Sequence, residues 1–350
     1  MRIANSNITL SRNSNLDFAR GLAILIMLLA NSAPYLLKSG EVPFYARLLF
    51  SSAAPIFIFL SGYSLNLSFK NNKSLIKIIS RSLQILLIAI LIDSIIWKII
   101  PFETFDVLYF IGISQLLLIA IHKLKPKFKL FLLLLSIVFY VVATLQFTYR
   151  FQIGENSFSP DNFNLFSLKS SLTRMLFDGW FPLLPWFCIA LLGYLAKDYN
   201  FNLLKIKYPI VLGIILMVSS YVLFNLVPDS VNSPRENYLE LFYPIKLIFG
   251  LFLCGLFTML TAFINSKFEI KSFLTNIGKL SLFVYLIHTL IISFLLTKFH
   301  FTIINDFTTF IITELLFITT ILIICNLINI VKPYLMKYKM TKPILFLLGL

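Results

Sequence analysis

The sequence predicts an all-α integral membrane protein, a polytopic bundle of about ten transmembrane helices with both termini in the cytoplasm. Two observations carry this prediction. Apolar stretches long enough to cross a bilayer recur along the chain, and the loops between them alternate in their content of basic residues. The composition agrees, because 59% of the 350 residues are hydrophobic and only 13% are charged. A soluble chain of this length could not bury so much apolar surface, whereas lipid accepts it on every outward face.

The individual spans follow from length, since a helix needs roughly 20 predominantly apolar residues to cross the hydrocarbon core. Residues 1–15 form a cytoplasmic segment, residues 16–331 the membrane domain, and residues 332–350 a basic cytoplasmic tail. The tail ends in an apolar stretch that is too short to span. In order, the predicted spans lie near 16–37, 46–68, 79–100, 106–122, 130–148, 180–196, 208–227, 243–265, 277–298 and 307–331.

The charges of the loops set the predicted orientation. One set of alternate loops is strongly basic, with only Asp198 and Glu269 as clear acids, and short basic loops stay in the cytoplasm. The net charge of +15 therefore reflects topology and contact with anionic lipids, and it argues against nucleic-acid binding. The basic residues of this set are Arg2, Arg12, Lys70, Lys73, Lys77, Arg81, Lys123, Lys125, Lys127, Lys129, Lys197, Lys205, Lys207, Lys267, Lys271, Lys279, Lys332, Lys337, Lys339 and Lys342.

The cysteines and the short loops indicate which cofactors and which membrane to expect. Cys188, Cys254 and Cys325 fall inside predicted spans without a CxxC spacing, so neither a disulfide framework nor a metal site is expected. Membrane lipids are the expected surroundings, and the short loops favour a bacterial cytoplasmic (inner) membrane. The sequence leaves the oligomeric state open, a homodimer included.

Two spans carry stripes of polar side chains, which are costly inside lipid. In the first span, Asn31 follows eleven residues after Arg20. Eleven helical residues turn through about 1100°, so these two side chains share one face, about 16 Å apart along the axis. In the ninth span, Ser281, Tyr285 and His288 fall at i, i+4 and i+7. Such stripes suit either a path through the bundle or ordinary hydrogen bonds between helices.

Further charged side chains fall at membrane depth. Asp17 lies three residues before Arg20, so an ion pair within the first helix accounts for both. Asp93 in the third span and Glu314 in the tenth are carboxylates for which a structural hydrogen bond and a functional role both remain open.

Several segments, taken in order, resemble the heparan-α-glucosaminide N-acetyltransferase family and its bacterial homologues, and more distantly the type 3 acyltransferases. The likeness begins with an opening helix that contains Arg20 and Asn31. The similar segments are LDFARGLAILIMLLAN at Leu16–Asn31, APIFIFLSG at Ala54–Gly62, Ser80–Arg81–Ser82, FPLLPWF at Phe181–Phe187 with Leu191–Leu192–Gly193, and the stripe that ends at His288.

The resemblance implies transfer of an acetyl group from cytoplasmic acetyl-CoA to a sugar or glycan on the far side of the membrane. Basic side chains can hold the phosphates of CoA, although the positive-inside rule also accounts for cytoplasmic lysines. Aromatic side chains on the outer side can stack against a sugar, although an interfacial belt explains them too. The candidate phosphate-binding residues are Arg20, Arg81, Lys70 and Lys73, and the candidate sugar-binding residues are Trp180, Trp186 and Tyr45.

The catalytic pair that the resemblance implies is incomplete in this chain. In the family, an Asn at the position of Asn31 works with a His in the loop between the first two spans. Asn31 matches, but no histidine occurs from Ser32 to Tyr63. Three alternatives stay open: Glu41 in that loop acts as the base, His288 does so if the first and ninth spans meet, or the protein has lost the reaction.

The leading interpretation is therefore an integral-membrane acetyltransferase. The alternative is a transporter or lipid-linked sugar translocator on the same scaffold, with Asp93, Glu314 and His288 as its coupling or binding groups. A non-catalytic membrane partner of an envelope enzyme is a third interpretation. The sequence does not identify the acceptor or the acyl chain length, and it does not distinguish ester from amide formation.

Overall fold

The structure is a computed structural model that describes residues 12–37, 42–146, 171–198, 208–227, 247–267, 270, 272–298, 306–338 and 341–348. The regular elements in these ranges are helical. They are α1 (Ser14–Leu36), α2 (Phe44–Ser51), α3 (Ala53–Lys70), α4 (Leu75–Leu91), the π-helical η2 (Ile92–Trp97), α5 (Val107–Ile121), α6 (Pro126–Gln146), the π-helical η4 (Arg174–Asp178), α8 (Leu183–Ala196), α9 (Pro209–Leu226), α11 (Leu247–Ile264), α12 (Phe273–Lys279), α13 (Ser281–Lys298), α14 (Phe307–Leu335) and α15 (Lys342–Leu347).

Each predicted span contains a helix, but the helices differ in length. Within the described ranges, six apolar segments are long enough to cross a membrane, and seven if the bent pair α12 and α13 counts as one. Helix α5 has 15 residues and α8 has 14. At 1.5 Å per residue these reach about 21–23 Å, less than the roughly 30 Å hydrocarbon core. The all-helical membrane class is confirmed, whereas the number of ten spans and the cytoplasmic termini remain predictions.

Two predicted spans are interrupted in the structure. The second, expected as one helix over 46–68, consists of α2 and α3 with a break at Ser52. The ninth, expected over 277–298, bends by 86° between α12 and α13. Helix α12 begins with its own capping box at Ser272 and Thr275, which starts a separate helix before the apolar run. The polar stripe therefore begins with Ser281, the first residue of α13.

Glycines bring pairs of helices into backbone contact at the centre of the bundle. Helix α3 packs along α8, and α1 along α12. A Cβ atom at Gly62 or Gly193 would lie 2.0 Å from a backbone oxygen of the facing helix in the α3–α8 pair. At Gly21 and Gly278, in the α1–α12 pair, the same distances are 2.1 and 1.8 Å. Such small residues let membrane helices approach closely, so these four positions fix the spacing around the site.

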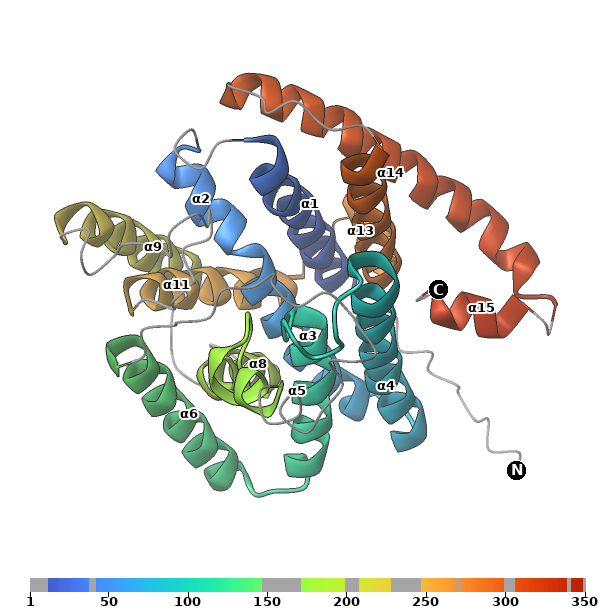
Figure 1. The fold of residues 1–350 in the computed structure, drawn as a ribbon. Helices are drawn as coiled ribbons and strands as arrows, with labels where there is room; N and C mark the ends of the chain where they lie inside the picture. Colours follow the sequence, from blue (N-terminus) through green and yellow to red (C-terminus); the bar gives the residue numbers. More distant parts are fainter. Residues whose placement is uncertain are drawn as a thin grey trace, which may run out of the picture.

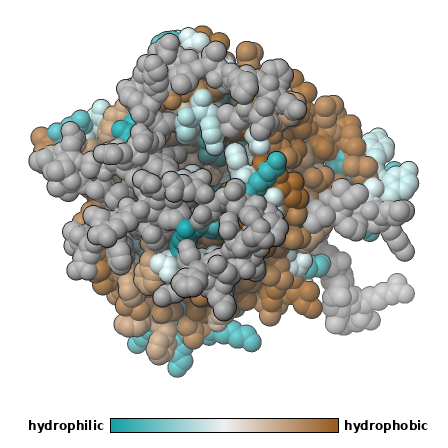
Figure 2. Space-filling model, viewed as in Figure 1, coloured by the Kyte–Doolittle hydropathy of each residue, from teal (hydrophilic) through white to brown (hydrophobic). Residues whose placement is uncertain are grey.

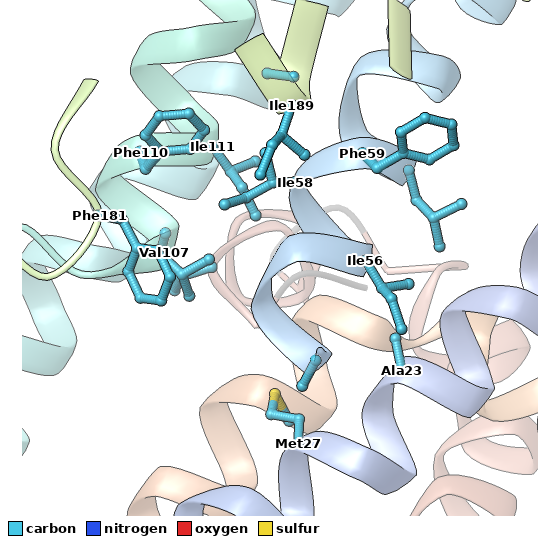
Figure 3. Close-up of a cluster of buried hydrophobic side chains, with 14 of the residues drawn as sticks. Ala23, Met27, Ile56, Ile58, Phe59, Val107, Phe110, Ile111, Phe181 and Ile189 are labelled. Atoms are coloured by element: carbon cyan, nitrogen blue, oxygen red, sulfur yellow. The ribbon is translucent and has the colours of Figure 1, made fainter. Parts of the chain in front are cut away.

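The core between these helices is apolar and draws on segments far apart in the chain. Side chains of α1, α3, α5, α8 and the segment before α8 meet there (Figure 3). Those labelled in Figure 3 are Ala23, Met27, Ile56, Ile58, Phe59, Val107, Phe110, Ile111, Phe181 and Ile189.

The outer helices expose apolar surface, as lipid-facing helices do. Helices α6, α9 and α14 lie at the periphery of the bundle (Figure 1). Only 17% of the apolar window is buried in α9, and 17% in α14. The described surface at the upper right and across the lower part of Figure 2 is mostly hydrophobic, with hydrophilic residues at the far right and at the bottom rim. Bulk water would not accept this surface, so it supports the assignment to a membrane.

Candidate functional site

Asn31 on α1 and His288 on α13 meet in the bundle. The amide Nδ2 of Asn31 lies 2.8 Å from Nε2 of His288, whose side chain is fully buried. On the other side of the ring, Nδ1 lies 3.1 Å from the carbonyl oxygen of Val284. Because a carbonyl only accepts, we assign the proton of the neutral ring to Nδ1, so that Nε2 accepts from Asn31. The histidine thus orients the Asn31 amide, and the second N–H of that amide stays available for another partner.

Asn31 also lines a pocket of about 480 Å³, counting the space that is open to the outside. Its walls come from α1, α2, α3, the start of α5, α13 and the segments that precede α5 and α8. Four of the lining side chains can form hydrogen bonds, those of Asn31, Asp106, Tyr285 and Trp180, and the aromatic rings supply flat apolar surfaces. The lining residues are Met27, Ala30, Asn31, Phe50, Ala53, Ala54, Phe57, Asp106, Val107, Trp180, Phe181 and Tyr285.

Asp106 is a pocket residue that the sequence analysis did not select. It is the N-cap of α5, and its Oδ1 accepts a hydrogen bond of 2.6 Å from the Val107 N–H. Its Oδ2 accepts a hydrogen bond of 2.5 Å from the hydroxyl of Tyr285. The available signal was an Asp directly before an apolar helix, which is typical of an N-cap and by itself indicates only a structural role.

A cluster of three arginines, Arg12, Arg20 and Arg81, lies toward the other end of α1. Arg12 and Arg20 both pair with the buried Asp17, in the case of Arg20 at 2.7 Å. Arg20 also donates to the hydroxyl of Ser64 on α3, at 2.5 Å. Arg81 is close enough to Arg12 and Arg20 to be repelled by both. We call these three residues the arginine cluster. Its described ion pairs all end on Asp17, so it keeps an excess of positive charge.

The predicted shared face of Arg20 and Asn31 agrees with the packing against α3. Arg20 reaches Ser64 in the second half of α3, while Asn31 shares its pocket with Ala53 and Ala54 at the start of that helix. Because α1 and α3 run in opposite directions, the two polar residues are separated along one helix interface. The arginine cluster and the pocket are therefore the two ends of one contact surface.

The predicted lysines lie outside the ion pairs of this cluster. The Nζ of Lys70 pairs with Asp198 at 2.7 Å and donates to the carbonyl oxygen of Lys197 at 3.1 Å. Lys73 is exposed in the turn between α3 and α4. Neither residue is thereby tested as a phosphate ligand, and both remain candidates on sequence grounds.

The predicted aromatic residues and Glu41 are placed differently from one another. Trp180 lines the pocket. Trp186 is 1% exposed and packs against Phe181 with ring centroids 5.0 Å apart, so it supports the pocket wall from behind. Tyr45 is 63% exposed and is not among the lining residues. Glu41 lies outside the described residues.

The two other predicted carboxylates are both buried. Asp93, on η2, accepts a hydrogen bond of 2.8 Å from the hydroxyl of Tyr109. Glu314, on α14, interacts with Ser32 of α1, and its Oε2 has no hydrogen-bond partner among the described residues. Neither side chain lines the pocket.

Comparison with known proteins assigns the chain to a family. Residues 12–211 match the description "Heparan-alpha-glucosaminide N-acetyltransferase, catalytic", which covers more than half of the chain. The matched region includes Asn31, Asp106 and Trp180, whereas Tyr285 and His288 lie beyond it. Searches of curated proteins and of solved structures gave no match. On the strength of the matched catalytic region, the chain belongs to the heparan-alpha-glucosaminide N-acetyltransferase family of membrane acetyltransferases.

Proposed function

We propose that this protein transfers an acetyl group from cytoplasmic acetyl-CoA to a sugar or glycan on the opposite side of the membrane. The observation that carries the proposal is the oriented amide of Asn31, which lies within the matched catalytic region and lines the pocket. A bacterial cytoplasmic membrane is the proposed location, and membrane lipids surround the bundle.

Asn31 suits the electrostatic demand of acyl transfer. When a nucleophile attacks a thioester, negative charge develops on the carbonyl oxygen, and a fixed N–H donor stabilises that charge. The hydrogen bond to His288 occupies one N–H of Asn31 and holds the other in place. The site can stabilise the negative charge on the carbonyl oxygen because the free N–H of Asn31 needs no reorientation during the reaction.

The arginine cluster is suited to binding acetyl-CoA, the acetyl donor. CoA is a polyanion, and guanidinium groups bind phosphates through charge-assisted hydrogen bonds. Arg20 and Asn31 are separated by about 16 Å along α1. The thin pantetheine arm would cover that distance between phosphates held at the cluster and a thioester at the pocket.

The pocket suits a polar acceptor with an apolar face. Trp180 and Phe57 offer flat surfaces for a sugar ring, while Asp106 and Tyr285 offer hydrogen-bonding groups. Glucosamine, which carries both an amine and hydroxyl groups, is therefore a suitable test acceptor.

The first test is acetyl-CoA binding by calorimetry with detergent-purified protein. We expect Arg20→Ala and Arg81→Ala each to weaken binding by about tenfold or more, since a hydrogen bond to a charged group contributes about 1.5–3 kcal/mol. Lys125→Gln is the control, because it removes an exposed cation that belongs neither to the arginine cluster nor to the candidate phosphate-binding residues. Unchanged binding in both arginine variants would contradict this donor site.

A transporter is the second candidate, and Glu314 is the observation that favours it. A buried carboxylate oxygen without a hydrogen-bond partner is costly, and such groups mark ion or proton paths in membrane proteins. A folded wild-type protein that binds no acetyl-CoA would overturn the acetyltransferase and favour this candidate. A flux that is independent of CoA and abolished by Glu314→Gln would then support it.

A further inference from the structure

Among the described residues that line the pocket, Asp106 is the one ionisable carboxylate, and its hydrogen bonds leave lone pairs that can accept more. Oδ1 of Asp106 accepts from the Val107 N–H, and Oδ2 accepts from the Tyr285 hydroxyl. Each carboxylate oxygen has two lone pairs, so one position on each oxygen remains for a ligand in the pocket. The two existing bonds hold the carboxylate in a fixed orientation.

The segment that carries Asp106 has an unusual backbone. Lys98, Phe102 and Phe105 all adopt positive φ angles, of 55°, 66° and 46°. Left-handed conformations are strained for such bulky residues and persist only where the surroundings enforce them. Such strain concentrates at functional sites, which makes the position of Asp106 more than a consequence of helix capping.

Contacts with a distant segment enforce this backbone. The Trp180 N–H donates to the Thr104 carbonyl at 2.9 Å, and the Phe181 N–H donates to the Phe105 carbonyl at 3.1 Å. An ion pair between Arg174 and Glu103 joins the same two segments. Asp106 and Trp180 are thereby held on neighbouring walls of the pocket.

His288, which contacts Asn31, already has a hydrogen-bond partner at each ring nitrogen. Nε2 of His288 accepts from Asn31, and its Nδ1 faces the carbonyl of Val284, so neither ring nitrogen is available as a base. Among the described lining residues, the remaining groups that can take part in proton transfer are Asp106 and Tyr285, and Tyr285 donates its proton toward Asp106.

We propose that Asp106 is the catalytic base that accepts the proton of the acceptor. This inference rests on the proposed acetyl transfer. As the acceptor oxygen or nitrogen bonds to the acetyl carbon, its proton passes to Asp106. The carbon–sulfur bond then breaks, its electron pair goes to sulfur, and the proton passes from Asp106 to that sulfur to give the CoA thiol. Asn31 holds the carbonyl oxygen, and Tyr285 holds the carboxylate.

The chain supplies a matched control for this proposal. Asp93 is another carboxylate that accepts from a tyrosine hydroxyl, that of Tyr109, but it is buried and does not line the pocket, whereas Asp106 is half-buried and does. Asp106→Asn and Asp93→Asn therefore make the same chemical change to a carboxylate that accepts from a tyrosine hydroxyl, once inside the pocket and once outside it. Tyr285→Phe and Tyr109→Phe form a second matched pair.

The experiment measures transfer of radiolabelled acetyl from acetyl-CoA to glucosamine by purified protein in detergent. We expect Asp106→Asn to lower kcat by about 10²–10⁴-fold, the range for loss of a general base, with little change in acetyl-CoA affinity. Asp93→Asn should stay close to the wild type. Asp106→Glu, which keeps a carboxylate, should recover part of the rate lost in Asp106→Asn.

Each other outcome is informative. An active wild type with an equally active Asp106→Asn would overturn Asp106 as the base and leave the proposed function intact. Loss of acetyl-CoA binding in both Asp106 variants would show a structural role instead, which also overturns it. A wild type that transfers nothing to glucosamine counts against the proposed function, and the inference falls with it.

Discussion

At the scale of single residues, the amide of Asn31 is the group whose removal should affect chemistry more than binding. We expect Asn31→Ala to lower kcat by about 10²–10³-fold, because the charge it stabilises exists only in the transition state. The KM for acetyl-CoA should change little. Steady-state kinetics with glucosamine measures both. Asn225→Ala is the control, since Asn225 is exposed on α9 and donates to Tyr221 of its own helix. A change in KM alone would contradict the role.

His288 should act through Asn31 as a positioning residue. We expect His288→Gln to retain more activity than His288→Leu, because a glutamine carbonyl can still accept a hydrogen bond from the Asn31 amide whereas leucine cannot. The ratio of the two kcat values at saturating acetyl-CoA tests this. Equal loss in both variants would show that the imidazole itself is required.

The residues of the site were predictable to the extent that they lie on helix stripes. Helical periodicity selected Asn31 and His288, and their contact shows that the first and ninth spans meet, but the same contact occupies Nε2 of His288, so it does not favour His288 as the base. Asp106 was not predictable, because its place in the pocket depends on the left-handed backbone at Phe102 and Phe105 and on hydrogen bonds from Trp180 and Phe181. No local pattern in the sequence reports either condition.

At the scale of helices, the close approach of α3 and α8 should be sensitive to one methyl group. A Cβ at Gly193 would lie 2.0 Å from the backbone oxygen of Phe59, so the helices must separate. We expect Gly193→Ala to destabilise the protein by about 1–3 kcal/mol or more, the usual cost of overpacking, and to lower the Tm in detergent. Thermal unfolding followed by circular dichroism measures the effect.

Gly250→Ala is the matched control on α11. A Cβ there would lie 2.9 Å from the hydroxyl of Tyr140, the end of a side chain that can move. Since alanine also favours helix more than glycine, the control should be close to neutral. An equal loss of Tm in Gly193→Ala and Gly250→Ala would contradict the proposed tight contact between α3 and α8.

Helix positions were predictable from hydrophobicity, and helix breaks were not. The predicted ninth span began at residue 277 and so joined the end of α12 to α13, because hydropathy averaged over a span does not report the bend of 86° between them. Likewise the π-helical turn that carries Asp93 lies within an apolar run. These irregularities arise from packing against other helices, such as the contact of Gly278 with α1.

At the scale of the whole molecule, the two functional regions lie at opposite parts of the α1–α3 interface. The arginine cluster is near the start of α1, and the pocket is near the start of α3. A donor that enters from one side and an acceptor from the other could then meet at Asn31 without either crossing the membrane. This route requires the orientation predicted from the basic loops, with the arginine cluster on the cytoplasmic side.

That orientation can be tested with single cysteines at exposed positions, in a Cys254→Ala background that removes the exposed native thiol. We expect Lys73→Cys and Lys337→Cys to react with a membrane-impermeant maleimide only after the cells are lysed. Tyr45→Cys and Asp306→Cys should react in intact cells. The physical reason is that short basic loops stay in the cytoplasm.

The labelling pattern also distinguishes a reversed topology from a second span that does not cross the membrane. A fully reversed pattern would put the arginine cluster outside, where cytoplasmic acetyl-CoA cannot reach it, and the proposed direction of transfer would fail. Labelling of the Tyr45 and Lys73 variants from the same side would show that α2 and α3 do not cross the membrane together. Because Arg20 donates to Ser64 and Asn31 shares the pocket with Ala53 and Ala54, α1 lies along this part of α3 and could then not cross the membrane either, although its 23 residues are long enough to do so.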